Sequence, residues 1–260
     1  MNHSRIPVVC SIGSIDPLGA SGLTMDLRVY AHLGAAGLAV VAAVTAQNSR
    51  RVTAVGPLSP TLIAKQLQSI WEQVKPDAVC IGLLPGVPTI KAVSAFLRRL
   101  SARPPIVLDP VMAASSGSRF LALREIRQLK TLLPLATVVT PNVFEAAAFT
   151  GSRVTTLLQA QAAARELNRY GCAALVTGGH LPGTACVDVL AVRGRARRFV
   201  SSRLHGEMRG AGGILSAALA VNLARGMKLE RAIGQARQFV RRAHRNTQRL
   251  GSGTPQFIAR

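Results

Sequence analysis

Short apolar runs alternate with longer amphipathic segments along most of the chain. Residues 6–12 and 38–44 are mostly apolar, which is typical of strands buried on both faces. Residues 21–34, between them, have the spacing of a helix with one apolar face. Further strands are predicted at residues 78–81, 105–108, 137–140 and 173–176, and further helices at residues 59–74, 88–100, 121–133 and 156–170. This alternation predicts an α/β protein with a mostly parallel central sheet and helices on both faces.

The pattern changes toward the C-terminus. Two short strand candidates flank the dipeptide Arg193-Gly194, which predicts a β-hairpin. These strands cover residues 186–192 and 197–200, and two long helices are predicted after them at residues 213–226 and 229–250. No linker, low-complexity stretch or internal repeat interrupts the sequence. We therefore expect residues 1–260 to form a single domain.

The composition is that of a folded chain with a sizeable core. Of the 260 residues, 48% are hydrophobic and 17% are charged, which excludes an intrinsically disordered protein. The four cysteines are far apart and form no Cys-x-x-Cys pair, which argues against a zinc site and a disulfide framework. No secretory signal is recognised, and no apolar run reaches the about 18–20 residues that a membrane-spanning helix needs. We expect a cytoplasmic protein without a membrane partner.

The chain carries a formal charge of +21, from 32 basic and 11 acidic residues. Between residues 193 and 249 there are 14 Lys or Arg and only two acids, Glu207 and Glu230. Such a field attracts polyanions. Aromatic residues make up only 4% of the chain and do not interleave with the basic ones, so platforms for stacking bases are missing. We expect a solvated basic surface and no specific nucleic-acid binding.

Acidic residues gather at the predicted carboxyl ends of the strands. Four of the 11 acids, Asp16, Asp26, Asp109 and Glu145, lie on or just beyond those ends. In open α/β sheets, ligands bind outside the carboxyl ends of the strands, where loops and helix N-termini converge. The sequence therefore predicts a ligand site at this edge of the sheet.

Six ordered motifs resemble those of one kinase family. They are GSIDPLGASG at residues 13–22 followed by Asp26, AVTAQN at 43–48, DPVM at 109–112, TPNVFEA at 140–146, VTGGH at 176–180 and GAG at 210–212. Their order and spacing are similar to those of the hydroxymethylpyrimidine/phosphomethylpyrimidine kinases, ribokinase-like enzymes of thiamine biosynthesis. The resemblance implies a ribokinase-like three-layer α/β/α sandwich. It also implies ATP-dependent phosphorylation of 4-amino-5-hydroxymethyl-2-methylpyrimidine and its monophosphate, ATP and Mg²⁺ as cofactors, and a homodimer.

The resemblance assigns a substrate-binding set. Asp26 and Gln47 match family positions that hydrogen-bond the aminopyrimidine, while Gly13, Leu83 and Val111 match positions around the ring. A carboxylate and an amide are able to satisfy a ring nitrogen and an exocyclic amine. Structural explanations compete with these roles. Asp26 is also explained as a helix first-turn acid facing the dipole, Gln47 as a loop amide, and the apolar residues as core packing.

A second set lies near the metal and the phosphates. By resemblance, Asp109 and Glu145 are the acids near Mg²⁺, and Asn142, Thr177 and Arg209 lie beside the ATP phosphates. The anion hole of the family corresponds to Gly210, Ala211, Gly212 and Gly213. Glycines that open a helix expose backbone N–H groups toward an anion, and the helix dipole adds to the attraction. The competing explanations are strand-end acids that cap the following helices and a tight turn that needs glycine.

The chain departs from the family at positions that carry the chemistry. The family's catalytic cysteine, the expected base, is Gly213 here, and three family lysines are replaced by Cys80, Ser115 and Thr177. Loss of a general base typically lowers the rate by about 10²–10⁴-fold, and loss of a charged phosphate contact by about 10²–10³-fold.

Two hypotheses therefore stay open. In the first, the chain is a kinase in which Arg209 restores positive charge and Glu207 or His180 serves as base. In the second, it is a catalytically degenerate paralogue that binds a pyrimidine or a nucleotide and has a sensing or regulatory role. Pyrimidine binding without ATP turnover distinguishes the second from the first.

Overall fold

One nine-stranded sheet forms the centre of the molecule in the computed structural model, which describes residues 5–114 and 116–258. The strand order is β3-β2-β1-β4-β5-β6-β7-β8-β9. The bounds are β1 Val8–Ile15, β2 Ala36–Gln47, β3 Val52–Pro57, β4 Ala78–Ile81, β5 Ile106–Leu108, β6 Val138–Val139, β7 Ala173–Val176, β8 Ala185–Val192 and β9 Arg195–Ser202. Neighbours from β2 through β7 pair in parallel, whereas β3, β8 and β9 pair antiparallel. The predicted mostly parallel sheet is confirmed.

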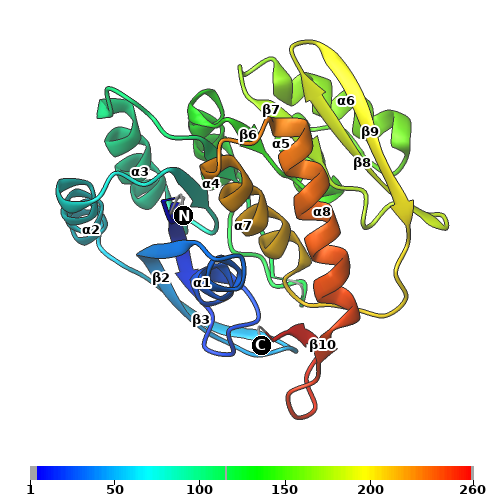
Figure 1. Cartoon of the computed structure of the whole chain (residues 1–260), viewed down its shortest axis with the longest axis horizontal. Helices are drawn as coiled ribbons and strands as arrows, with labels where there is room; N and C mark the ends of the chain where they lie inside the picture. The colour runs from blue at the N-terminus through cyan, green and yellow to red at the C-terminus, as the bar shows by residue number, and fades with distance from the viewer. Residues whose placement is uncertain (1–4, 115, 259–260) are drawn as a thin grey trace.

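Helices cover both faces of the sheet (Figure 1). One layer contains α1 (Gly22–His32), α7 (Ala211–Ala224) and α8 (Leu229–Arg245). The other contains α2 (Pro60–Gln73), α3 (Val87–Arg99), α4 (Leu123–Leu129), the 3-10 helix η1 (Lys130–Leu135), α5 (Val143–Thr150) and α6 (Leu157–Asn168). Consecutive residues of β1 contact different layers: Val9 packs against the first and Cys10 against the second. The predicted three-layer α/β/α architecture is confirmed.

Helix α7 is the central helix of its layer, because it packs between α1 and α8. Every residue from 214 to 223 is buried. Helix α8 instead buries a single apolar stripe. The stripe consists of Ala232, Ile233, Ala236, Phe239 and Ala243. Its spacing is that of an amphipathic surface helix. Burial on all sides holds the N-terminus of α7 against the carboxyl ends of the strands.

Several predicted elements differ from the structure. Strand β3 was not predicted, because its residues lie on an exposed edge and lack an alternating pattern. The helix predicted at residues 121–133 is α4 followed by η1, since Pro134 lacks an N–H and disfavours a continued α-helix. Helix α5, of eight residues, lies inside the TPNVFEA motif and was also not predicted. The last helix ends at Arg245 rather than at residue 250, and the short strands β10 (Thr247–Gln248) and β11 (Gln256–Phe257) follow.

The predicted hairpin is confirmed in β8 and β9. Arg193 and Gly194 have φ values of 49° and 75°, and positive φ at both central residues is the mark of a type I′ hairpin turn. The hairpin is tied to the helical layer by a buried ion pair. Arg237 Nε on α8 donates to Asp188 Oδ2 on β8 over 2.7 Å.

The C-terminal segment returns to the edge of the sheet where the β1–α1 loop lies (Figure 1). The N–H of Arg209 donates to the carbonyl of Pro255 over 3.0 Å, and Gln256 Nε2 donates to the carbonyl of Leu18 over 3.5 Å. The segment thus joins the β1–α1 loop to the residues that precede α7.

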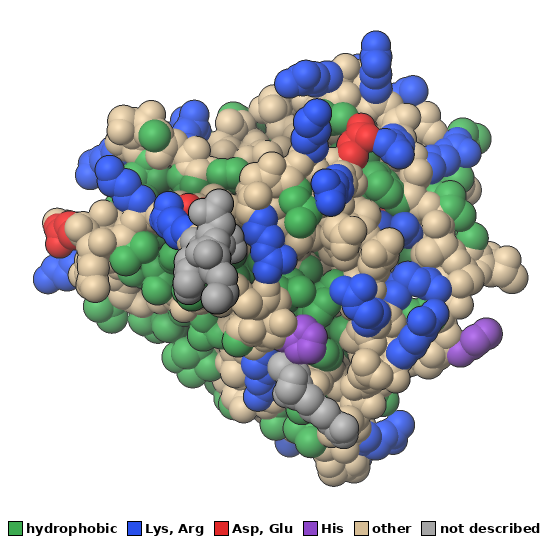
Figure 2. Space-filling model, in the orientation of Figure 1, with side chains coloured by type: hydrophobic (Ala, Val, Ile, Leu, Met, Phe, Trp, Pro, Cys, Tyr) green, Lys and Arg blue, Asp and Glu red, His purple; other side chains and the backbone are tan. Residues whose placement is uncertain are grey.

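Basic side chains are scattered over the face shown in Figure 2, with few acidic side chains among them. They do not gather into one stripe on this face. Within residues 5–114 and 116–258, none of the helices combines the length and the apolar character needed to cross a membrane.

Candidate active site

Asp26, on α1, is a buried acid that forms no ion pair with any basic side chain in the described part of the chain. The Ser11 hydroxyl donates a 2.8 Å hydrogen bond to Asp26 Oδ2, and Ser11 Oγ lies 2.5 Å from the Tyr30 hydroxyl oxygen. Burial and the negative charge of Asp109 raise the pKa of Asp26 to about 7, against the effect of the Ser11 hydrogen bond. The first turn of α1 contains no acid, so the explanation of Asp26 as a first-turn dipole acid is wrong.

Asp109 and Glu145 are brought together at the carboxyl ends of β5 and β6. Asp109 follows β5 directly, and its N–H donates to the carbonyl of Ile81 over 2.8 Å. Burial raises the pKa of Asp109, although the Ser216 hydroxyl opposes this. Burial and the charge of Asp109 raise the pKa of Glu145. Two buried carboxylates that repel one another favour a proton or a cation beside them.

This pair suits Mg²⁺ better than a structural metal. In the part of the chain that the structure describes, no three His, Cys, Asp or Glu side chains form a group able to hold a metal ion. Mg²⁺ keeps several waters, and one or two carboxylates together with substrate phosphates are enough to bind it. Asp109 and Glu145 are therefore the residues able to hold Mg²⁺ beside a phosphorylated ligand.

Asn142 and Glu145 form a capping box at the start of α5. Asn142 Oδ1 accepts hydrogen bonds from the N–H groups of Phe144 and Glu145, while Glu145 Oε2 accepts one from the Asn142 N–H over 2.8 Å. Helix capping therefore explains the N-x-x-E pattern in part, because it uses Asn142 Oδ1 and Glu145 Oε2. The Asn142 amide nitrogen and Glu145 Oε1 take no part in the box. Thr177 lies next to Asn142, and its N–H donates to the carbonyl of Pro141 over 2.9 Å.

The N-terminus of α7 faces open space. Its N-cap, Gly210, has a φ of 80°, and a Cβ there would lie 2.1 Å from the carbonyl oxygen of Ala20, so the position requires glycine. Helix α7 begins at Ala211 and has no side-chain cap. A Cβ added at Gly212 or Gly213 would meet none of the described neighbouring atoms within 4 Å. No hydrogen bond between described residues engages the N–H groups of Ala211, Gly212 or Gly213, so these groups are available to an anion.

Arg209 is buried directly before α7. Its Nη2 lies 3.5 Å from Asp16 Oδ2, which is long for a charge-assisted hydrogen bond. Asp16 also accepts hydrogen bonds from the Leu18 N–H over 3.0 Å and from the Ser21 hydroxyl over 2.9 Å. Among the side chains that the structure describes, Arg209 Nη1 is the one fully buried nitrogen or oxygen without a hydrogen-bond partner. The contact between Asp16 and Arg209 was not predicted.

Gln47 ends β2, which extends past β1 as a flap paired with β3. The Thr45 hydroxyl fixes the base of the flap by donating to the carbonyl of Ile15, the last residue of β1, over 2.8 Å. No hydrogen bond between described residues joins Gln47 to the other candidate residues. Gln47 therefore lies near the strand ends without being fixed to them.

The apolar members of the predicted substrate set pack against the sheet. Gly13 lies against the backbone of Leu83, since a Cβ added at Gly13 would lie 3.8 Å from the Leu83 nitrogen. Leu83 belongs to the core under α2 and α3, and Val111 packs against the same core. Core packing is sufficient to explain both side chains.

The replaced family positions lie in different environments. Cys80 is buried in the core shared with α1 and α7, and burial raises its pKa well above the ordinary value. Ser115 lies outside the described residues. The His180 ring packs against Phe144 at a tilt of 59°, with ring centroids 5.1 Å apart, and burial together with the charge of Arg203 lowers the pKa of His180. No hydrogen bond between described residues holds His180 toward the start of α7.

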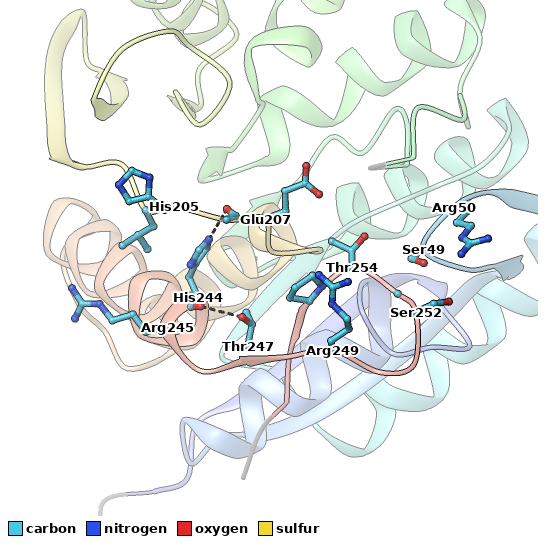
Figure 3. Close-up of a pocket in the computed structure, with 14 residues that line it drawn as sticks. Ser49, Arg50, His205, Glu207, His244, Arg245, Thr247, Arg249, Ser252 and Thr254 are labelled. Atoms are coloured by element: carbon cyan, nitrogen blue, oxygen red, sulfur yellow. Dashed lines mark hydrogen bonds between the residues drawn. The ribbon is translucent and has the colours of Figure 1, made fainter.

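An open cleft of about 740 Å³ lies between the loop before α7 and the C-terminal segment (Figure 3). The loop before α7, the end of α8, the C-terminal segment and the β2–β3 turn contribute to its walls. Its ionisable lining residues are Arg50, His205, Glu207, His244, Arg245 and Arg249. Figure 3 shows His244 bound to the loop before α7, where its Nε2 lies 3.1 Å from the Gly206 carbonyl oxygen. The cleft was not predicted, although the basic excess between residues 193 and 249 was a signal for it.

Comparisons with known proteins identify relatives of this chain. The sequence profile of the phosphomethylpyrimidine kinase family matches residues 16–257. The hydroxymethylpyrimidine/phosphomethylpyrimidine kinase of Rhizobium meliloti is 38% identical over 255 residues, with 95% of this chain and 93% of the relative covered. The thiamine biosynthesis bifunctional protein ThiED of Geobacter sulfurreducens is 36% identical over 248 residues, with 94% of this chain covered, and the chain spans 50% of its length.

Solved structures with the same fold include two vitamin kinases. An ADP complex of Bacillus subtilis pyridoxal kinase superposes with a TM-score of 0.90 at 28% identity, with 98% of each chain covered. The phosphomethylpyrimidine kinase of Clostridium difficile 630 superposes with a TM-score of 0.81 at 30% identity, with 92% of this chain and 100% of the other covered. Because the family profile spans most of the chain and relatives above 30% identity cover nearly all of it, this chain belongs to the phosphomethylpyrimidine kinase family.

Proposed function

We propose that the protein transfers the γ-phosphoryl group of ATP to the hydroxymethyl oxygen of 4-amino-5-hydroxymethyl-2-methylpyrimidine, with ADP as the leaving group and the hydroxyl proton passing to water. A second ATP then phosphorylates the monophosphate once more. Family membership and the activities for which the relatives are named support this reaction. The observation that carries the proposal is local: Asp109, buried after β5, lies within electrostatic reach of the buried carboxyl groups of both Asp26 and Glu145. Asp109 also lies beside Ser216, one turn into α7, so the acids and the free helix N-terminus share one site.

The residues of this chain divide the work of binding and orientation. Asp26 binds the aminopyrimidine, because a carboxyl group with a pKa near neutrality presents either a donor or an acceptor to the ring edge. Gln47 closes over the ring from the flap. Asp109 and Glu145 hold Mg²⁺, which when bound neutralises the charge of the phosphates. The Asn142 amide nitrogen and Thr177 lie beside the phosphates.

The reaction does not require a base at position 213, although a base would accelerate it. Phosphoryl transfer proceeds through a loose transition state, so positioning and charge stabilisation account for most of the acceleration. The anion hole at residues 210–213 provides both, because its N–H groups and helix dipole face the transferred group. A base at Gly213 would add about 10²–10⁴-fold.

Mass spectrometry with MgATP and the hydroxymethylpyrimidine tests the proposal. We expect monophosphate and then diphosphate to accumulate, and Gly213→Cys to accelerate the reaction, because a Cβ at this position meets no described neighbour. Pyridoxal is the comparison substrate, since the fold superposes well on a pyridoxal kinase. If the pyrimidine raises Tm while neither substrate is phosphorylated, the protein is the degenerate binding paralogue and the proposed reaction is wrong.

Four further properties belong to this proposal. We propose that residues 1–260 act as one kinase domain, that the protein functions as a homodimer, and that it works in the cytoplasm. Specific nucleic-acid binding is not expected, because the basic residues lack interleaved aromatic side chains. Sedimentation velocity measures the oligomeric state directly.

A further inference from the structure

We propose that Arg209 Nη1 donates a hydrogen bond to the phosphoryl group held at the N-terminus of α7. Arg209 then supplies a positive charge to this group through a side chain, in addition to the backbone N–H groups of the helix. This inference rests on the proposed function, because it concerns the phosphates of the same ligand.

The first observation is the unpaired donor itself. Only 7% of the Arg209 side chain is exposed, and Nη1 has neither solvent contact nor a hydrogen-bond partner. Leaving a buried charged donor unpaired is costly, and nearly all such groups in native proteins have a partner. A ligand oxygen is the kind of partner that would complete this guanidinium, and its approach requires the guanidinium to move, because Nη1 has no surface open to solvent.

The second observation places the guanidinium beside the start of α7. Asp16 Oδ2 receives both Arg209 Nη2 and the Ser21 hydroxyl. The Cα of Ser21 in turn lies 3.8 Å from the position of a Cβ on Gly210, the N-cap of α7. The guanidinium and the free N–H groups of α7 therefore flank the same short segment of the β1–α1 loop.

The third observation is that the charge of Arg209 is incompletely neutralised. Asp16 is its one acidic partner in the described part of the chain, at 3.5 Å, and that carboxylate already accepts two shorter hydrogen bonds. The basic cleft is lined by two residues close to Arg209: Glu207 lies two positions before it, and the carbonyl of Pro255 accepts its N–H. A polyphosphate that enters this cleft meets positive charge along the path to Arg209.

Calorimetric titration of the intact protein with inorganic pyrophosphate tests the inference without requiring turnover. We expect Arg209→Gln to weaken pyrophosphate binding by about 10- to 100-fold, as loss of a charge-assisted hydrogen bond does. Arg209→Lys keeps the charge but loses the planar fork, so we expect an intermediate affinity. Arg98→Gln is the control for loss of an arginine elsewhere, because Arg98 on α3 is exposed, donates to the carbonyl of Thr131 and lies in the opposite helical layer. Folded Arg209→Gln protein that binds pyrophosphate like the unsubstituted protein overturns the inference.

A crystal structure of the unsubstituted protein with a non-hydrolysable ATP analogue provides a second test that does not depend on how the variants fold. Nη1 of Arg209 within hydrogen-bond distance of a phosphate oxygen supports the inference, and a phosphate group that leaves Nη1 unpaired contradicts it. The proposed function fails separately. If the unsubstituted protein forms no phosphorylated product but loses pyrophosphate binding in Arg209→Gln, the inference is supported while the kinase activity is not.

Discussion

Two buried arginine–aspartate pairs differ in how completely their hydrogen bonds are formed. Arg237 Nε lies 2.7 Å from Asp188 Oδ2, and its Nη2 donates to the Cys186 carbonyl and the Ser201 hydroxyl. Asp188 uses its second oxygen to accept the Gly178 N–H over 2.8 Å. This pair is a closed network that joins α8, β8, β9 and the loop after β7.

The pair of Arg209 and Asp16 is incompletely bonded by comparison, and we refer to it as the open pair. Its atoms are 3.5 Å apart, one guanidinium nitrogen is unpaired, and both side chains are at least as buried as those of Arg237 and Asp188. Burial alone therefore does not leave an arginine donor unpaired in this protein. The difference indicates that the closed pair serves the fold, whereas the open pair serves a ligand.

The closed pair is expected to show the larger effect on stability. Arg237→Gln leaves Asp188 buried without its cation, which lowers the free energy of unfolding by about 3–5 kcal/mol. Arg209→Gln is expected to cost much less, because Asp16 keeps its hydrogen bonds to Leu18 and Ser21. Urea denaturation followed by circular dichroism measures both. Equal losses in the two variants would mean that the open pair is also structural.

The open pair is expected to show the larger effect on turnover. Arg209→Gln removes a charged donor from the transferred phosphoryl group, so kcat is expected to fall by about 10²–10³-fold. Arg98→Gln is expected to retain the kcat of the unsubstituted protein, because Arg98 contacts Ser94 and Thr131 in the other helical layer. Steady-state kinetics at saturating ATP give the comparison. A change confined to KM would show that Arg209 contributes to ground-state binding only.

Asp26 extends the comparison to a buried acid that, among the described residues, pairs with the Ser11 hydroxyl instead of an arginine. Its folded-state pKa is about 7 against an ordinary value of 3.8, so the folded protein holds a proton that the unfolded chain releases between these pH values. Stability is therefore full at low pH and falls as pH rises through about 7, by a few kcal/mol in total.

Asp26→Asn removes this titration, so the variant is expected to gain stability relative to the unsubstituted protein on going from pH 4 to pH 8. Urea midpoints at several pH values measure the difference. Glu72→Gln, an exposed acid on α2, is the control. A difference between the variant and the unsubstituted protein that does not change with pH would mean that Asp26 has an ordinary pKa in the folded state.

Sequence patterns predicted the fold well for elements whose structure is determined by residues close together in the chain. The parallel strands read as apolar runs because both faces are buried, and the hairpin turn is encoded by Arg193 and Gly194. The same reasoning found Asp109 and Glu145 at the strand ends, because the carboxyl ends of parallel strands share one edge. Strand β3 was missed since its pairing with β2, rather than its own pattern, makes it a strand.

The rest of the site depends on contacts between distant parts of the chain. Asp16 and Arg209 are 193 positions apart, and no spacing rule connects them. The cleft likewise needs four segments that only the folded chain assembles. Asn142 illustrates a different difficulty. Its N-x-x-E pattern with Glu145 is explained by a local capping box, so the pattern alone does not indicate a ligand site.

The smallest expected effect is a change in stability at the first turn of α7, close to the pair of Arg209 and Asp16. Gly213 is in the first turn of this helix, and a Cβ there meets no described neighbour, so Gly213→Ala is expected to raise stability by about 0.5–1 kcal/mol. Gly171→Ala is the matched control: it also has free space, but its φ of 93° disfavours any side chain, so a loss of about 1–2 kcal/mol is expected. Thermal unfolding of both variants separates the two causes. If Gly213→Ala is as destabilising as Gly171→Ala, the first turn of α7 is not free, and the phosphate that Arg209 is proposed to contact lacks the space to bind there.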